Sequence, residues 1–135
     1  MREILFRGKT EEGKWLEGYL HKIDGIGKGY RAFAIQVQDI DARMCRPHSH
    51  EVIPETVGQF TGLTDKNGNK IFEGDYLVVN YQGNFLNEGF VEYNNKNYCW
   101  CIRQKNGLLI HFDQYGSHFI EVIGNIHNNK ELLGE

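Results

Sequence analysis

Long apolar runs are absent from this chain. No stretch approaches the ~18 consecutive apolar residues that a membrane-spanning helix requires. The opening residues, MREILFRGK, have no apolar core of the kind found in a secretory signal peptide. We therefore expect a soluble, cytoplasmic protein with no membrane partner.

Cysteine is scarce, and its number is odd: the three in the chain are Cys45, Cys99 and Cys101. Cys99 and Cys101 are two residues apart, so on a strand their side chains point to the same face, but a disulfide between them would be strained. Their spacing matches no standard zinc knuckle. We expect free thiols in a reducing compartment, and we predict neither a metal site nor a cofactor.

The common catalytic motifs are also missing. The sequence contains no phosphate-binding P-loop, no dinucleotide-binding glycine pattern and no serine nucleophile elbow. The acids Asp65, Glu73 and Asp75 each lie beside a glycine or in a turn. Turn formation explains them better than a role as paired acid and base does. We predict no catalytic residue and a protein that is not an enzyme.

One segment, CRPHSHE, does hold metal-binding residue types. Its candidate ligands are Cys45, His48, His50 and Glu51. Their spacing fits no recognised zinc motif, so we interpret them as solvated loop residues. A nucleophilic Cys–His pair has no support either, because nothing in the sequence brings Cys45 or Cys99 to a distant histidine.

Proline is rare as well, with two prolines against 16 glycines, while aromatic residues make up 13% of the chain. This balance favours strands and tight turns over helices. A chain of 135 residues fits one domain of ordinary size or two very small ones. We expect one compact structural unit that is mainly β.

The N-terminal segment, residues 1–58, is predicted to be β-rich. Pro54 suits the first position of a short helical turn near residues 54–58, and Gly18 marks a candidate bulge. An irregular loop is expected over residues 39–51. Period-two patterns predict strands over residues 3–7, 15–21 and 31–37.

Residues 59–135 are predicted to form a hairpin followed by a small barrel. In the turn TDKNGNK, Asp65 can accept a hydrogen bond from a nearby backbone amide, and Asn67 and Gly68 tolerate positive φ. The flanking pieces QFTGL and KIFEGD should pair. Five short strands then follow at the spacing of a small barrel, over residues 76–81, 88–93, 98–102, 108–112 and 119–123.

Three blocks of the sequence resemble the signature blocks of the YopX family, small proteins of prophages and phages of Gram-positive bacteria. They are REILFRGKTEEGKWLEGYL, PETVGQFTGLTDKNGNKIFEGDYL and VIGNIHNNKELL. The resemblance implies a mainly β protein with an SH3-like barrel in its C-terminal part. It carries no catalytic assignment. The residues that match the family pattern do so as motif positions only, and they are Gly62, Asp65, Gly68, Gly74 and Asp75.

Aromatic residues supply the candidate binding surface. Tyr98, Trp100 and Ile102 share one face by alternation, and one face must fill the core. Tyr81 and Tyr93 lie near strand ends beside polar loops, so they are the rings we expect at the surface. We interpret the protein as a non-enzymatic interaction module that docks an unknown phage or host protein.

Nucleic-acid binding in phage replication or regulation is the alternative. Tyr81, Tyr93 and Trp100 could stack on bases, while Arg103 and Lys105 add positive charge. Residues 1–50 hold nine Lys/Arg and seven Asp/Glu, whereas residues 51–135 hold six and eleven. This acidic balance places the protein-docking interpretation first. Open strand edges leave homo-oligomers as a further option.

Overall fold

The structure is a computed structural model, and it describes residues 3–24, 31–38, 47–111 and 117–128. Antiparallel strands dominate it, which confirms the mainly β prediction. The described residues also include two short 3₁₀ helices, η1 (Pro54–Thr56) and η3 (Ser117–Phe119). The strands are β1 (Phe6–Lys9), β2 (Trp15–Asp24), β3 (Arg31–Gln38), β4 (Pro47–Val52), β5 (Gly58–Thr64), β6 (Lys70–Phe72), β7 (Asp75–Tyr81), β8 (Asn84–Asn94), β9 (Cys99–Arg103), β10 (Leu109–His111) and β11 (Ile120–Asn125).

The chain divides into two compact units, residues 1–60 and 61–135. Strand order is β4-β3-β2-β1-β5-β6 in one sheet and β10-β9-β8-β7-β11 in the other. The division falls within strand β5. Gly58 and Gln59 of β5 pair with β1, and β6 is the other neighbour of β5. Among the described residues, no helix has the length and apolar character needed to cross a membrane.

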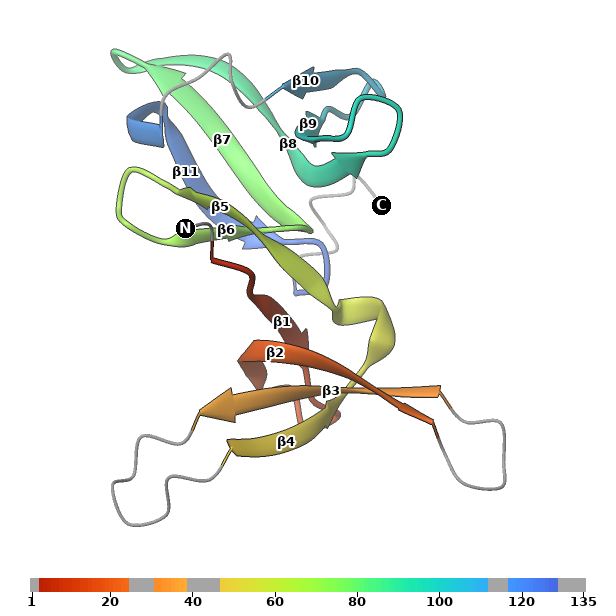
Figure 1. The fold of residues 1–135 in the computed structure, drawn as a ribbon. Helices are drawn as coiled ribbons and strands as arrows, with labels where there is room; N and C mark the ends of the chain where they lie inside the picture. The colour runs from red at the N-terminus through yellow and green to blue at the C-terminus, as the bar shows by residue number, and fades with distance from the viewer. Residues whose placement is uncertain (1–2, 25–30, 39–46, 112–116, 129–135) are drawn as a thin grey trace. The chain divides into compact units, whose positions relative to one another are not determined.

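In the first unit, β2, β3 and β4 run side by side (Figure 1). Leu16, Ile35 and Val52 form the core of this unit. Gly18 pairs in regular register with Phe6 of β1, so it is not a bulge. A Cβ at Gly18 would lie 2.0 Å from the Gln36 carbonyl oxygen. The glycine is needed because β3 approaches β2 closely at this point.

Strand β4 corrects the prediction of an irregular loop over residues 39–51. Residues 47–52 pair with β3 along their whole length, while residues 39–46 lie outside the described residues. The segment has no alternating apolar pattern, because an edge strand needs few apolar side chains. Its His50 and Glu51 are exposed, and Val52 is buried. The short helical turn expected at Pro54 is present as η1, with Pro54 in its first turn.

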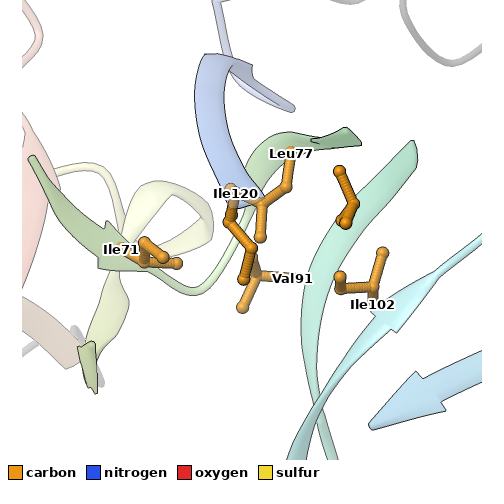
Figure 2. Packing of buried hydrophobic residues seen from close by; sticks show 6 residues of the cluster. Ile71, Leu77, Val91, Ile102 and Ile120 are labelled. Atoms are coloured by element: carbon orange, nitrogen blue, oxygen red, sulfur yellow. The ribbon is translucent and has the colours of Figure 1, made fainter. Parts of the chain in front are cut away.

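The second unit is built on the five-stranded sheet. Figure 2 shows its core, where Leu77, Val91, Ile102 and Ile120 converge from β7, β8, β9 and β11, and Ile71 of β6 lies close by. Each of these side chains is at most 2% exposed. All five strands expected here exist, and alternation places Leu77, Val79 and Ile102 on the core face.

The five strands do not close into the barrel that we expected. The strand order ends at β10 on one side and β11 on the other, and within the described part of the chain these two edges do not pair with each other. The sheet is therefore open. Strand β11 is not left bare at its edge, because the Ile120 carbonyl oxygen and the Val122 N–H bond residues of the β5–β6 hairpin.

Asp65 links the β5–β6 hairpin to strand β11. Its carboxylate is 4% exposed and accepts hydrogen bonds from the backbone N–H groups of Asn67 (2.9 Å), Asn69 (2.8 Å) and Val122 (3.0 Å). The neighbouring Lys66 N–H donates to the Ile120 carbonyl oxygen at 2.9 Å. This carboxylate therefore organises the fold, and its hydrogen-bonding capacity is used by backbone.

Gly74 and Asp75 hold the next turn in place. Gly74 has a φ of 90°, and its N–H and carbonyl bond the Val91 carbonyl oxygen (2.9 Å) and the Ile126 N–H (2.8 Å). Asp75 is 1% exposed and accepts a hydrogen bond from the Phe72 N–H at 2.8 Å.

Gly62 and Gly68 have φ values of 90° and 83°, whereas Asn67 stays outside the positive-φ region. These motif residues have structural roles.

Acid should weaken the link made by Asp65. Burial alone would raise the pKa of Asp65, but the hydrogen bonds from the Val122, Asn69 and Asn67 N–H groups outweigh it and hold the pKa below its usual value of 3.8. A carboxyl with a lowered folded-state pKa stabilises the fold above its unfolded-state pKa, and that stability is lost as the pH falls through the folded-state pKa. Urea unfolding at neutral and acid pH should show a larger acid loss for wild type than for Asp65→Asn. Equal losses would contradict this assignment.

Candidate functional site

The functional candidates of the second unit lie where β8 extends past β9. Strand β8 pairs with β7 from Asn84 to Phe90, but it pairs with β9 only over Phe90–Asn94. Beyond Arg103 the chain turns away, and the turn is closed by the Gln104 N–H, which donates to the Leu108 carbonyl oxygen at 2.9 Å. Within the described part of the chain, the first half of β8 therefore has no partner strand on the side opposite β7.

Gly89 lies at the point where β9 leaves β8. A Cβ there would lie 2.3 Å from the Arg103 carbonyl oxygen and 2.8 Å from the Ile102 Cγ2 atom. Only glycine admits the end of β9 at this distance. The position of the β9–β10 turn beside β8 thus requires a residue without a side chain at position 89.

A bulge brings two large apolar side chains to the surface beside that turn. Asn87 pairs with Val79 and Phe85 pairs with Asn80, so Leu86 has no partner in β7. A bulge interrupts the alternation of faces. Phe85 is 59% exposed and Leu86 is 49% exposed.

These side chains line a groove of about 310 Å³ that opens to solvent. We call it the β8 groove. Asn87 and Gln104 meet inside it, because Gln104 Nε2 donates to the side-chain oxygen Oδ1 of Asn87. The same Asn87 oxygen accepts the Glu88 N–H at 3.2 Å. The lining residues are Phe85, Leu86, Asn87, Glu88, Gln104, Lys105 and Asn106.

The five binding residues predicted from sequence do not form one surface. Lys105 lines the β8 groove. Tyr81 is 45% exposed, and its ring packs edge-on against Phe119 at a centroid distance of 5.1 Å. Tyr93 packs edge-on against Trp100, also at 5.1 Å, and Trp100 packs against the core.

Arg103, the fifth predicted residue, is engaged by an acid. Its Nη2 donates to Glu92 Oε1 at 2.7 Å, and its Nε donates to the other carboxylate oxygen. The hydrogen bond from Arg103 lowers the pKa of the Glu92 carboxyl. The positive charge of Arg103 is therefore balanced on the sheet surface.

A second group of residues lies on the opposite face of β9 from the core residue Ile102. Cys99 Sγ lies 3.0 Å from His111 Nδ1 and 3.8 Å from Cys101 Sγ. Cys101 Sγ lies 3.8 Å from the same His111 nitrogen. Burial and the neighbouring Cys99 sulfur raise the pKa of the Cys101 thiol to about 11. We call these three residues the thiol–imidazole cluster.

Sequence reasoning missed Phe85 and Leu86 as a pair, and it missed His111 altogether. Their segment, QGNFLN, lies between the predicted strands 76–81 and 88–93, where two adjacent apolar residues could have signalled exposure. His111 joins the cysteines only through strand pairing, since it faces Cys101 across β9 and β10. That register cannot be read from the spacing of the residues.

Comparison with known families now places the chain. A family model described as "YopX protein" matches residues 5–134. The chain belongs to the YopX family. This confirms the resemblance drawn from the three sequence blocks.

A solved structure is similar to this YopX-family protein. The crystal structure of protein EF1440 from Enterococcus faecalis matches it with a TM-score of 0.53 and 27% sequence identity, covering 98% of this chain and 99% of that one. No curated protein matches this YopX-family chain.

Proposed function

We propose that this YopX-family protein is a non-enzymatic interaction module, which binds an extended apolar segment of a partner protein of phage or host in the β8 groove. The observation that carries the proposal is the adjacent exposure of Phe85 (59%) and Leu86 (49%) along that groove. Exposed apolar side chains around a hollow are typical of surfaces that bind another molecule.

The shape of the groove favours an extended occupant. Its floor is one strand of a sheet, and β9 leaves that strand at Phe90. A peptide strand laid beside β8 can use main-chain pairing for affinity and alternate side chains for specificity. The Asn87–Gln104 hydrogen bond closes one part of the groove with polar groups. The peptide's apolar side chains should therefore contact Phe85 and Leu86.

Charge supports a protein partner over nucleic acid. Lys105 and Glu88 both line the groove, and Arg103 is paired with Glu92. Residues 51–135 carry six Lys/Arg against eleven Asp/Glu. A phosphate backbone is bound by clustered, uncompensated positive charge. Single-stranded DNA is therefore the natural competing probe.

Selection from a displayed library of random peptides tests the proposal. We expect wild-type protein to enrich peptides with alternating apolar residues, which bind as monomers to one protein chain. Phe85→Ser or Leu86→Ser should weaken binding of a selected peptide at least about fivefold, because truncating an anchor residue costs more than about 1 kcal/mol. Fluorescence anisotropy with the labelled peptide measures the effect.

Ile123→Ser is the matched control. Ile123 is 48% exposed and lies on β11, at the other edge of the same sheet, so its replacement should leave peptide binding unchanged. Three results would contradict the proposal. They are equal weakening by Ile123→Ser, no enrichment of any peptide, and salt-dependent binding of single-stranded DNA that Phe85→Ser abolishes. Self-association that Phe85→Ser abolishes would name a second copy as the occupant instead.

A further inference from the structure

The thiol–imidazole cluster gathers three metal-ligand atoms on one face of the sheet. Cys99 and Cys101 project from the same side of β9, and His111 lies directly across from Cys101 on β10. All three ligand atoms lie within 4.8 Å of one another. Cys101 is fully buried, while Cys99 and His111 are half-buried.

The distances within the cluster are close to the edges of a metal tetrahedron. Zinc binds cysteine sulfur at about 2.3 Å and histidine nitrogen at about 2.0–2.1 Å, so tetrahedral angles place two sulfurs about 3.8 Å apart and a sulfur about 3.5–3.6 Å from a nitrogen. The observed sulfur–sulfur distance is 3.8 Å, and the sulfur–nitrogen distances are 3.0 and 3.8 Å. Binding one ion requires the Cys99 sulfur and the His111 nitrogen to move apart by about 0.5 Å.

We propose that Cys99, Cys101 and His111 bind a single zinc ion. Two thiolates and one imidazole favour zinc over Mg²⁺, Ca²⁺ and Mn²⁺, which prefer oxygen ligands. The thiol protons leave to solvent as the sulfurs bind the metal. A water molecule completes the tetrahedron. The proposal is independent of peptide binding in the β8 groove.

A metal here would have a structural consequence. Strand β10 is three residues long and forms one edge of its sheet, paired with β9 alone among the described strands. Zinc held by Cys99 and Cys101 on β9 and by His111 on β10 ties this short edge strand to its neighbour. The ion therefore acts as a staple for the β9–β10 hairpin, because it binds the folded arrangement and not the unfolded chain.

Cobalt titration of the full chain tests the site without any variant. The protein is purified in metal-free buffer with a non-thiol reductant, and Co²⁺ is added as a spectroscopic substitute for zinc. We expect one Co²⁺ per chain, a thiolate-to-cobalt charge-transfer band and strong tetrahedral visible absorption, all removed by one equivalent of Zn²⁺. A spectrum of hydrated Co²⁺ alone would overturn the proposal.

Variants then identify the ligands. Cys99→Ser and His111→Gln should each weaken zinc binding at least about a hundredfold, since changes to groups that merely support a ligand already cost about 10–100-fold. Cys45→Ser is the matched control and should bind zinc as wild type does. Retained affinity in the first two variants, or loss in Cys45→Ser, would overturn the assignment.

Thermal unfolding supplies a second readout. Saturating zinc should raise the melting temperature of wild type and of Cys45→Ser, but not that of His111→Gln. His111 is half-buried, so the variant is expected to fold without metal, and its own melting curve shows whether it does. A zinc-dependent rise in His111→Gln equal to that of wild type would contradict a role for this imidazole.

Discussion

Asp65→Ala is expected to destabilise the protein by about 3 kcal/mol or more, because three backbone N–H groups lose their acceptor and each unsatisfied buried donor costs about 1–3 kcal/mol. The carboxylate is 4% exposed. It bonds Asn67 and Asn69 within its own hairpin and Val122 on β11, across 57 positions of sequence. Urea unfolding at neutral pH measures the loss.

Asn106→Ala is the matched control for that variant. Asn106 Oδ1 accepts the Leu108 N–H at 3.0 Å in another turn of the same unit, but this bond is exposed. Water can satisfy the released N–H, so the cost should stay below about 1 kcal/mol. Similar losses in the two variants would mean that Asp65 is an ordinary turn residue.

Gly89→Ala is expected to cost about 3 kcal/mol or more and to disturb the β8 groove as well. The new Cβ would lie 2.3 Å from the Arg103 carbonyl oxygen and 2.8 Å from the Arg103 carbonyl carbon. Both are backbone atoms, so the end of β9 must move away, and forced overpacking of this kind typically costs about 1–3 kcal/mol or more. Amide exchange of the β8–β9 pairing should rise together with the loss of stability.

Gly83→Ala separates the effect of this contact from the general cost of replacing glycine. Nothing lies within 4 Å of a Cβ at Gly83, although its φ is 81°. The expected cost is about 1–2 kcal/mol of backbone strain, with no change in the β8–β9 pairing. If Gly89→Ala proved no worse than Gly83→Ala, β9 would not be held where the structure places it.

The core strands could be predicted because their residues alternate. Leu77 and Val79 on β7 and Ile102 on β9 follow the period of a half-buried sheet, and all three are fully buried. The Asp65 turn was equally readable, since local side-chain-to-backbone bonds depend on spacing. The hydrogen bond between Asp65 and Val122 could not be predicted, because the local sequence does not specify which distant strand contacts the second carboxylate oxygen.

The candidate sites depended on pairing register and therefore escaped the sequence. Phe85 and Leu86 are exposed together because a bulge interrupts β8, and a bulge leaves no periodic signal. His111 meets Cys101 because β10 folds back on β9 in one particular register. Barrel closure failed as an expectation for a related reason: strand count and spacing do not say which edges meet.

The central claim, that this YopX-family protein is a docking module whose binding surface is the β8 groove, is tested most directly by an amide chemical-shift map. The ¹⁵N-labelled full chain is titrated with a peptide selected on wild-type protein. We predict shifts at the Phe85–Glu88 and Gln104–Asn106 amides that saturate at one peptide per chain and are lost in Phe85→Ser. Shifts confined to residues outside the groove would contradict the claim, as would unchanged binding by Phe85→Ser.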